Sequence, residues 1–295
     1  MKALPFKGSG TALVTPFSRD GSVNYDEFAK LIEFQIAQGT DAIVICGTTG
    51  ETATLTDDER KKLISFGIEC VNFRIPVIAG TGSNDTHHCI ELSKYAMREG
   101  ADALLVVTPY YNKASQNGLI KHFYAVADST ALPVILYNVP SRTGLNIATE
   151  TYQALSKHEK IVATKEASGD ISQIARIAAE CGNDLYIYSG NDDQTIPILS
   201  LGAKGVISVF SNIMPFETHE ICRLWFEGKT EQALKLHLKY LDLMNTLFID
   251  VNPIPVKTAL KLMGYDVGGL RLPLCDMPDN KLKVLESRMK AVSLI

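Results

Sequence analysis

The sequence predicts an α/β protein, a (β/α)8 TIM barrel followed by a C-terminal helical appendix. Short apolar runs without polar alternation recur along the first two-thirds of the chain, which is typical of strands buried on both faces of a parallel sheet. Segments with helical periodicity separate most of these runs. Eight runs with this spacing are the number that a (β/α)8 barrel requires.

Each predicted strand is rich in Val, Ile or Leu. The eight are Thr11–Val14, Ala42–Ile45, Pro76–Ala79, Ala103–Val107, Pro133–Tyr137, Ile161–Thr164, Tyr186–Ser189 and Gly205–Val209. A doubly wound open sheet is the competing fold, and it often carries a glycine fingerprint after its first strand. Gly10-Thr-Ala-Leu13 gives no such fingerprint, and Gly80-Thr-Gly82 lacks a third glycine at the required spacing. These features favour the barrel.

The predicted helices carry recognisable end signals. Tyr25–Gln38 places its apolar side chains on one stripe. Asn24 and Thr56 are candidate N-caps, because their side chains can accept hydrogen bonds from the first helical N–H groups. Gly39 and Gly100 lie just past predicted helix ends, where a left-handed residue is common.

After about residue 215 the pattern becomes mainly helical. The helices predicted there are Glu231–Phe248, Val256–Met263 and Asn280–Val292. The apolar stripe of the first, which includes leucines at 234, 236, 238, 241 and 243, is expected to face the core. Asn252-Pro-Ile-Pro255 interrupts the helical pattern, since proline is poorly tolerated inside helices. We expect residues 1–225 to form the barrel that carries the active site and residues 226–295 to form a C-terminal helical domain.

The composition points to a small-molecule partner. The 295 residues are 46% hydrophobic and 21% charged, which excludes wholesale disorder. A net charge of −4 argues against nucleic acid, since no excess of Lys and Arg is available to neutralise phosphates. The sequence shows no signal peptide and no apolar run of about 18 residues, so we expect a cytoplasmic protein that does not enter a membrane. Six scattered cysteines are expected to be reduced thiols, and no His, Cys or acidic residues show metal-ligand spacing, so no metal is expected.

Lys165 is the leading candidate for catalysis. In barrels of this kind, reacting residues lie at the C-terminal ends of strands, and the sixth predicted strand runs directly into Lys165. Desolvation lowers the pKa of a lysine and leaves more of the amine neutral. A neutral amine can attack a ketone to form a Schiff base. The alternative is that Lys165 pairs with Glu166 at the rim.

Three other strand ends carry polar groups. Thr48 and Thr49 lie between glycines in Cys46-Gly-Thr-Thr-Gly-Glu51, which is either a ligand-binding loop or a tight turn. Tyr110 and Tyr111 follow the fourth strand and are either proton donors or half-buried amphipathic residues. The fifth strand is followed by an arginine, Arg142, whose planar fork suits a carboxylate, although most arginines simply lie on the surface.

Together these segments resemble the dihydrodipicolinate synthase family of class I pyruvate-dependent aldolases. The motifs are Gly47-Thr-Thr-Gly-Glu51, Pro109-Tyr-Tyr-Asn112, Tyr137-Asn-Val-Pro-Ser-Arg-Thr-Gly144 and Thr164-Lys-Glu-Ala-Ser-Gly169, and the resemblance covers essentially the whole chain. It implies a cytoplasmic lyase that condenses pyruvate with L-aspartate 4-semialdehyde to 4-hydroxy-tetrahydrodipicolinate, on the diaminopimelate route to lysine. No cofactor is implied beyond the Schiff base between Lys165 and pyruvate.

The resemblance also implies a role for each site residue. Lys165 would capture pyruvate, and Tyr137 would shuttle protons through a relay with Thr49 and Tyr111. The groups that it implies for substrate binding are Thr48 and Thr49 for the pyruvate carboxylate, Arg142 for the semialdehyde carboxylate, and Gly190 and Ile207 for the wall of the pyruvate site. Tyr111 would reach the site of a neighbouring subunit, which implies a homotetramer built as a dimer of dimers.

Two alternatives remain from the residues. N-acetylneuraminate lyase or another 2-keto acid aldolase of the same superfamily would share the barrel, the lysine and the tyrosine, but Ser-Arg-Thr-Gly around Arg142 and the Gly-Thr-Thr-Gly loop favour the synthase. A non-catalytic binding protein would need neither Lys165 nor Tyr137.

Lysine-sensitive members of the family hold lysine at a subunit interface. The resemblance maps that effector site to Thr52, Ala53, Asp57, Arg60, Asn84, His88 and Tyr110. His88 stands where a glutamate usually meets the effector's ammonium group. An imidazole is a poorer partner for a cation, so we expect weak or absent inhibition by lysine.

Overall fold

The computed structural model describes residues 2–295. Within that range, parallel strands follow one another around a closed barrel in their order along the chain, which confirms the predicted (β/α)8 TIM-barrel fold. The strands are β1 (Gly8–Ala12), β2 (Ala42–Ile45), β3 (Val77–Gly80), β4 (Ala103–Val107), β5 (Val134–Asn138), β6 (Ile161–Glu166), β7 (Tyr186–Ser189) and β8 (Gly205–Ser208).

Three strands, β2, β4 and β7, have the predicted bounds. The largest differences are at β1, which begins three residues before Thr11, and at β6, which continues two residues past Thr164. Both differences have the same cause, because the prediction counted only apolar side chains, whereas a strand is defined by its backbone. Gly8, Ser9 and Lys165 lie outside the apolar runs but belong to the strands β1 and β6. Because β6 continues through Lys165, that lysine lies within a strand.

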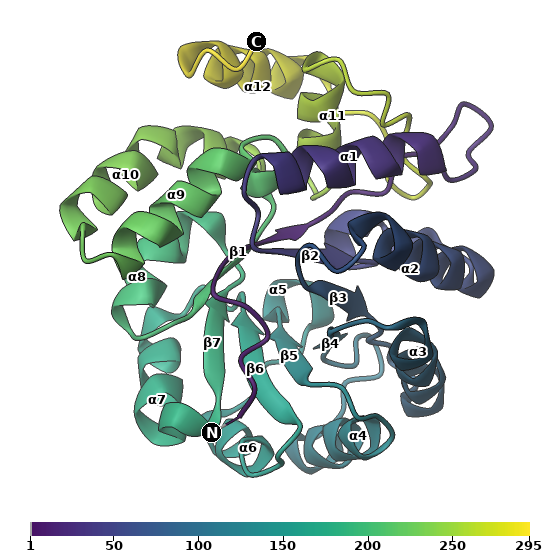
Figure 1. The fold of residues 1–295 in the computed structure, drawn as a ribbon, viewed down its shortest axis with the longest axis vertical. Helices are drawn as coiled ribbons and strands as arrows, with labels where there is room; N and C mark the ends of the chain where they lie inside the picture. Colours follow the sequence, from purple (N-terminus) through teal and green to yellow (C-terminus); the bar gives the residue numbers. More distant parts are fainter. Residues whose placement is uncertain (1) are drawn as a thin grey trace. The chain divides into compact units, whose positions relative to one another are not determined.

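The described chain forms two compact units. The first comprises the segment up to Lys7 and Pro76–Ile207, and it contains β3 to β7 and most of β8. Its helices are α3 (Thr86–Glu99), α4 (Gln116–Asp128), α5 (Pro140–Thr143), α6 (Thr149–Leu155), α7 (Ile171–Cys181) and α8 (Thr195–Ser200). Figure 1 shows α3, α4, α6 and α7 outside the strands of this unit, where each packs against the next.

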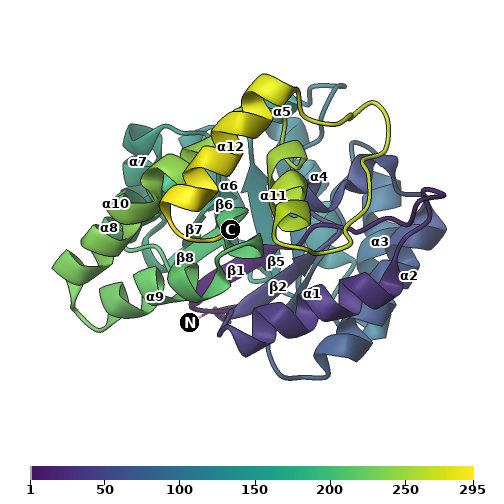
Figure 2. The ribbon, with the colours of Figure 1, turned by 90° about the horizontal axis from the view of Figure 1, so that it is seen from above.

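The second unit comprises Gly8–Ile75 and Ser208–Ile295. Its helices are α1 (Tyr25–Ala37), α2 (Asp57–Val71), α9 (Pro215–Phe226), α10 (Thr230–Thr246), α11 (Ile254–Leu262) and α12 (Asp279–Ala291). The predicted C-terminal helices are present as α10, α11 and α12, and Figure 2 shows α12 beside α10 and α11. The division of the chain at residue 225 stays a prediction.

The predicted helix ends are confirmed. The Asn24 side chain accepts a hydrogen bond from the first turn of α1, and Thr56 forms a reciprocal capping box with Glu59 at the start of α2. Gly39 and Gly100 have φ values of 86° and 96°, in the left-handed region that ends helices. The six cysteines, all within the described range, are thiols that form no disulfide.

The buried face of α10 follows the predicted leucines only in part, since Leu243 is 1% exposed. Its buried residues include Ala233, His237 and Tyr240, whereas Leu234 and Leu238 are 43% and 54% exposed. Among residues 2–295, no helix is both long enough and apolar enough to span a membrane.

Candidate active site

The first unit buries Lys165 beside Tyr137. Every residue of β6 is buried, and Lys165 itself is only 5% exposed. The pairing of β5 with β6 sets Tyr137 opposite Lys165, and Lys165 Nζ lies 4.5 Å from the centroid of the Tyr137 ring. An amine and a phenol therefore occupy neighbouring positions near the C-terminal ends of two paired strands, where barrel enzymes carry their reacting groups.

Glu166 has other partners than Lys165. Successive side chains of a strand point to opposite faces, and the buried Glu166 carboxylate accepts hydrogen bonds from Asn138 Nδ2 at 2.9 Å, from Ser168 Oγ at 2.7 Å and from Tyr152 Oη. Burial raises the pKa of the Glu166 carboxyl, while these hydrogen bonds favour its charged form. The structure therefore does not support a rim pair between Lys165 and Glu166.

Gly190 lies directly after β7 and contacts Glu166, the last residue of β6. Its backbone N–H donates to the carbonyl oxygen of Glu166 at 2.6 Å. A Cβ at this position would lie 2.7 Å from Ala167 Cβ and 2.9 Å from that carbonyl oxygen, so the contact admits only glycine. Ile207 is fully buried on β8.

The predicted residues that follow β4 and β5 are exposed. Arg142 lies on the short helix α5. Thr143, on the same helix, accepts a 3.2 Å hydrogen bond from Thr108 Oγ1, which ties α5 to the end of β4. Tyr110 is exposed, and Tyr111 is 89% exposed with φ 72°. A left-handed backbone is uncommon for a bulky residue, so this loop holds the Tyr111 ring outward at a cost in strain.

In the second unit, Thr48 and Thr49 form a 3₁₀ turn, η1 (Thr48–Gly50), directly after β2. Thr49 is buried and Thr48 is partly exposed. The turn is held from behind, because Thr15 Oγ1 donates to the carbonyl oxygen of Gly50 at 2.7 Å. A Cβ on Gly50 would lie 3.2 Å from both Thr15 Oγ1 and the Leu13 carbonyl oxygen, which favours glycine there.

Two residues that the sequence analysis missed join this turn. Asn252 Nδ2 donates to Thr49 Oγ1 at 3.0 Å, and Lys257 Nζ forms a buried ion pair with Glu51 Oε1 at 2.7 Å. Both residues are conspicuous in the sequence, since Asn252 begins the proline-containing interruption and Lys257 lies in a run that is otherwise mostly apolar. Periodicity alone could not say what they contact.

The predicted effector residues fall in both units. Thr52 and Ala53 lie in the 3₁₀ turn η2 (Thr52–Thr54), and Asp57 and Arg60 lie in α2, all in the second unit. Thr52 Oγ1 is buried without a hydrogen-bond partner in the described part of the chain.

The first unit contains the other three effector residues. The carbonyl oxygen of Asn84 accepts a hydrogen bond from Asn112 at 2.8 Å, and His88 Nδ1 lies 3.3 Å from Ser83 Oγ. Tyr110 follows β4.

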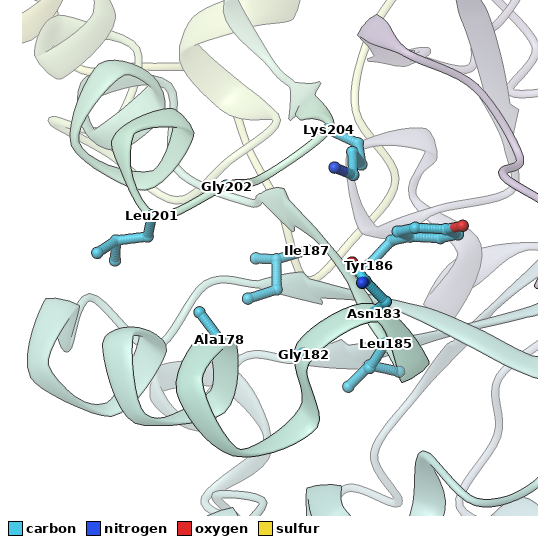
Figure 3. A pocket seen from close by; sticks show the side chains of 9 residues that line it. All are labelled: Ala178, Gly182, Asn183, Leu185, Tyr186, Ile187, Leu201, Gly202 and Lys204. Carbon is cyan, nitrogen blue, oxygen red and sulfur yellow. The ribbon is translucent and has the colours of Figure 1, made fainter. Parts of the chain in front are cut away.

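A cavity of about 220 Å³ in the first unit contains none of the predicted site residues (Figure 3). Tyr186, at the start of β7, and Lys204, just before β8, contribute to its lining, together with Leu201. The cavity therefore lies at the N-terminal ends of β7 and β8, whereas Lys165 lies near the C-terminal end of β6. Within residues 2–295, His, Cys, Asp and Glu side chains do not gather in groups of three or more that could hold a metal ion.

A (β/α)8 barrel whose sixth strand carries a buried lysine beside a tyrosine of the fifth has the arrangement of a barrel lyase. The chain belongs to the dihydrodipicolinate synthetase family, whose model matches residues 5–292. The family resemblance seen in the four sequence motifs is thereby confirmed.

Relatives and solved structures agree over nearly the whole chain. The 4-hydroxy-tetrahydrodipicolinate synthase of Clostridium perfringens is 57% identical over 290 residues, which are 98% of this chain and 99% of the relative. Dihydrodipicolinate synthase from Thermotoga maritima is 41% identical with a TM-score of 0.96, covering 99% of this chain and 100% of that one. The enzyme from Cyanidioschyzon merolae, solved with lysine bound, has the same identity, TM-score and coverage.

Proposed function

We propose that this protein condenses pyruvate with L-aspartate 4-semialdehyde to form 4-hydroxy-tetrahydrodipicolinate, on the diaminopimelate route to lysine. The observation that carries the proposal is the buried Lys165 amine beside the Tyr137 ring in a chain 57% identical to a synthase of that name over nearly its full length. A cytoplasmic location is part of the proposal, supported by relatives that are biosynthetic enzymes.

The Lys165 amine attacks the ketone carbon of pyruvate, and loss of water gives an iminium ion. The cationic nitrogen withdraws electrons, so the methyl group loses a proton and the adduct becomes an enamine, whose terminal carbon attacks the aldehyde. The amino group of the semialdehyde portion then attacks the iminium carbon, which closes the ring and releases the Lys165 amine. Tyr137 moves protons in these steps, Thr49 continues the relay, and Tyr111 of the partner subunit extends it to solvent. No cofactor is needed, since the Schiff base itself is the electron sink.

Both substrates are anions and need fixed partners. We assign the pyruvate carboxylate to the Thr48 hydroxyl and to the backbone N–H groups of Thr48 and Thr49, and we assign Gly190 and Ile207 to the wall of the pyruvate site. Arg142 binds the semialdehyde carboxylate, since a guanidinium can donate two parallel hydrogen bonds to it. The exposure of Arg142 on α5 supports this assignment, because the second substrate arrives from solvent.

Borohydride reduction in the presence of pyruvate tests the Schiff base. Mass spectrometry of wild-type peptides is expected to find a reduced pyruvyl adduct on Lys165, and Lys165→Arg is expected to abolish it. Lys204→Arg is the matched control, because Lys204 Nζ also lies near a tyrosine ring, at 5.7 Å from the Tyr186 centroid. An adduct that persists in Lys165→Arg contradicts the proposal.

Arg142→Ala separates the synthase from the other 2-keto acid aldolases of the superfamily. Loss of charge-assisted hydrogen bonds worth about 1.5–3 kcal/mol predicts a fall of roughly 10- to 150-fold in kcat/KM for the semialdehyde. The pyruvate adduct on Lys165 should still form. Cleavage of N-acetylneuraminate by the wild type, with no condensation of the semialdehyde, would instead establish the lyase.

We also propose a homotetramer, a dimer of dimers in which Tyr111 enters the partner's site. The support is its exposed ring on a left-handed backbone. Analytical ultracentrifugation should find a tetramer, and Tyr111→Phe should lower kcat without dissociating it. A fully active monomer would contradict this assembly.

Weak or absent inhibition by lysine completes the proposal. The effector residues assigned here are Thr52, Ala53, Asp57, Arg60, Asn84, His88 and Tyr110. A histidine at position 88 offers no carboxylate for the ammonium group of lysine. Titration of condensation activity with lysine tests this, and strong inhibition at submillimolar lysine would contradict it.

A further inference from the structure

We propose that Asn252 is a positioning residue that confines the Thr49 hydroxyl to the two orientations that serve the proton relay. This role rests on the proposed function, which assigns Thr49 to that relay. It adds to the relay a residue that stands just before α11, in the C-terminal part of the chain.

The contact is direct and shielded from water. Asn252 Nδ2 donates to Thr49 Oγ1 at 3.0 Å, and the two residues are 5% and 2% exposed. Because bulk water does not compete at such a site, the amide N–H remains on the hydroxyl oxygen. An NH₂ group donates hydrogen bonds and accepts none, so Asn252 cannot take the hydroxyl proton.

A hydroxyl has one hydrogen and two lone pairs. With one lone pair occupied by Asn252, Thr49 has one hydrogen and one lone pair left for its relay partners. In a transfer, a new O–H bond forms on the remaining lone pair of Oγ1 as the old O–H bond breaks, so Thr49 ends neutral and the Asn252 amide is unchanged. The hydroxyl then alternates between two orientations, and both lie along the relay.

Neighbouring contacts keep Asn252 and Thr49 at a fixed distance from each other. Lys257, on the first turns of α11, donates from Nζ to Glu51 Oε1 at 2.7 Å, to the Thr15 carbonyl oxygen at 3.0 Å and to the Gly269 carbonyl oxygen at 2.7 Å. Glu51 ends the η1 turn that contains Thr49. The turn and the start of α11 are therefore joined at two points, so the Asn252 amide is held against one hydroxyl rather than swinging among several.

Asn252→Asp and Asn252→Ala test the role, with pH profiles of kcat and KM. Removing the donor in Asn252→Ala should lower kcat about 10-fold with little change in KM for pyruvate. Asn252→Asp should be slower still near pH 8, because an ionised carboxylate accepts the Thr49 hydrogen and withdraws it from the relay. Its kcat should recover toward lower pH, where the protonated carboxyl donates again.

Thr49→Val provides the matched background. In that variant, Asn252→Ala should have no further effect on kcat, because the hydroxyl that it positions is gone. This comparison does not depend on whether Asn252→Asp folds. The proposal is wrong if Asn252→Asp matches or exceeds Asn252→Ala at every pH, or if the effect of Asn252→Ala persists undiminished in Thr49→Val. Failure of the proposed function looks different, since the wild type itself would then form no pyruvate adduct and no condensation product.

Discussion

Replacing Lys257 with methionine should destabilise the protein severely, because the change leaves a buried carboxylate without its counter-ion. The side chains of Lys257 and Glu51 are 1% and 0% exposed, and Nζ also donates to two carbonyl oxygens. Burial lowers the pKa of Lys257 to about 8, even though the Glu51 carboxylate favours the charged amine. After the change, Glu51 keeps a 3.1 Å hydrogen bond from the Arg271 backbone N–H but no cation at 2.7 Å.

Breaking a buried ion pair from one side costs about 3–5 kcal/mol. For a unit of this size, each 1 kcal/mol lowers the midpoint of thermal unfolding by roughly 2–4 °C, so Lys257→Met should lower it by roughly 6–20 °C. Urea unfolding at fixed protein concentration should show the same loss in the free energy of unfolding. Lys261→Met is the matched control on the same helix, since Lys261 pairs with Asp276 at 3.7 Å in an exposed position, where a pair is worth about 0–1 kcal/mol.

A double variant makes the cause identifiable. Adding Glu51→Gln to Lys257→Met removes the unpaired charge, so it should recover part of the lost free energy of unfolding. If Lys257→Met costs no more than Lys261→Met, or if Glu51→Gln makes the loss larger, the unpaired charge is not what destabilises the variant.

Three further predictions concern other contacts. A 2.9 Å hydrogen bond to Asp41 raises the pKa of His219. The pair therefore stabilises the fold fully below the unfolded pKa of about 6.5 and loses this effect as pH rises through the folded pKa. The difference in unfolding free energy between the wild type and His219→Gln should shrink with rising pH, and a difference that grows would refute this reasoning. Gly190→Ala should cost about 1–3 kcal/mol in urea unfolding, because the new Cβ would lie 2.9 Å from the Glu166 carbonyl oxygen; an unchanged midpoint would show that β6 yields freely. Tyr152→Phe should cost about 1–3 kcal/mol, because the buried Glu166 carboxylate loses a donor, and a neutral result in the same assay would show that the donor is dispensable.

Much of the fold was predictable because a buried strand appears in the sequence as a short run of consecutive apolar residues. A strand covered on both faces is apolar throughout, so the predicted bounds of β2 and β4 match the structure to the residue. A strand predicted from apolar residues stops at the first polar residue, whereas the backbone pairing of the real strand can continue past it. Lys165 and Glu166 pair with Tyr188 and Ser189 across β6 and β7, and β6 therefore extends beyond its predicted end.

Helix α10 shows the limit of periodicity. Leucines at several phases of the helix offer more than one apolar stripe, and the stripe that is buried runs through Ala233, His237 and Tyr240 while Leu234 stays exposed. Which face turns inward depends on the shapes of α9 and α12, both of which pack against α10. The neighbours are not recorded in the sequence of the helix itself.

The sequence by itself determined the barrel, the number and order of its strands, the family, and Lys165 as the candidate nucleophile, because strand burial and catalytic motifs are written in consecutive residues. Only the tertiary structure decided the partners of the buried polar groups. Glu166 turns away from Lys165 to Tyr152, and Thr49 and Asn252 meet although 203 residues separate them. A buried hydrogen bond depends on which distant segments packing brings within about 3 Å, and no local pattern encodes that distance.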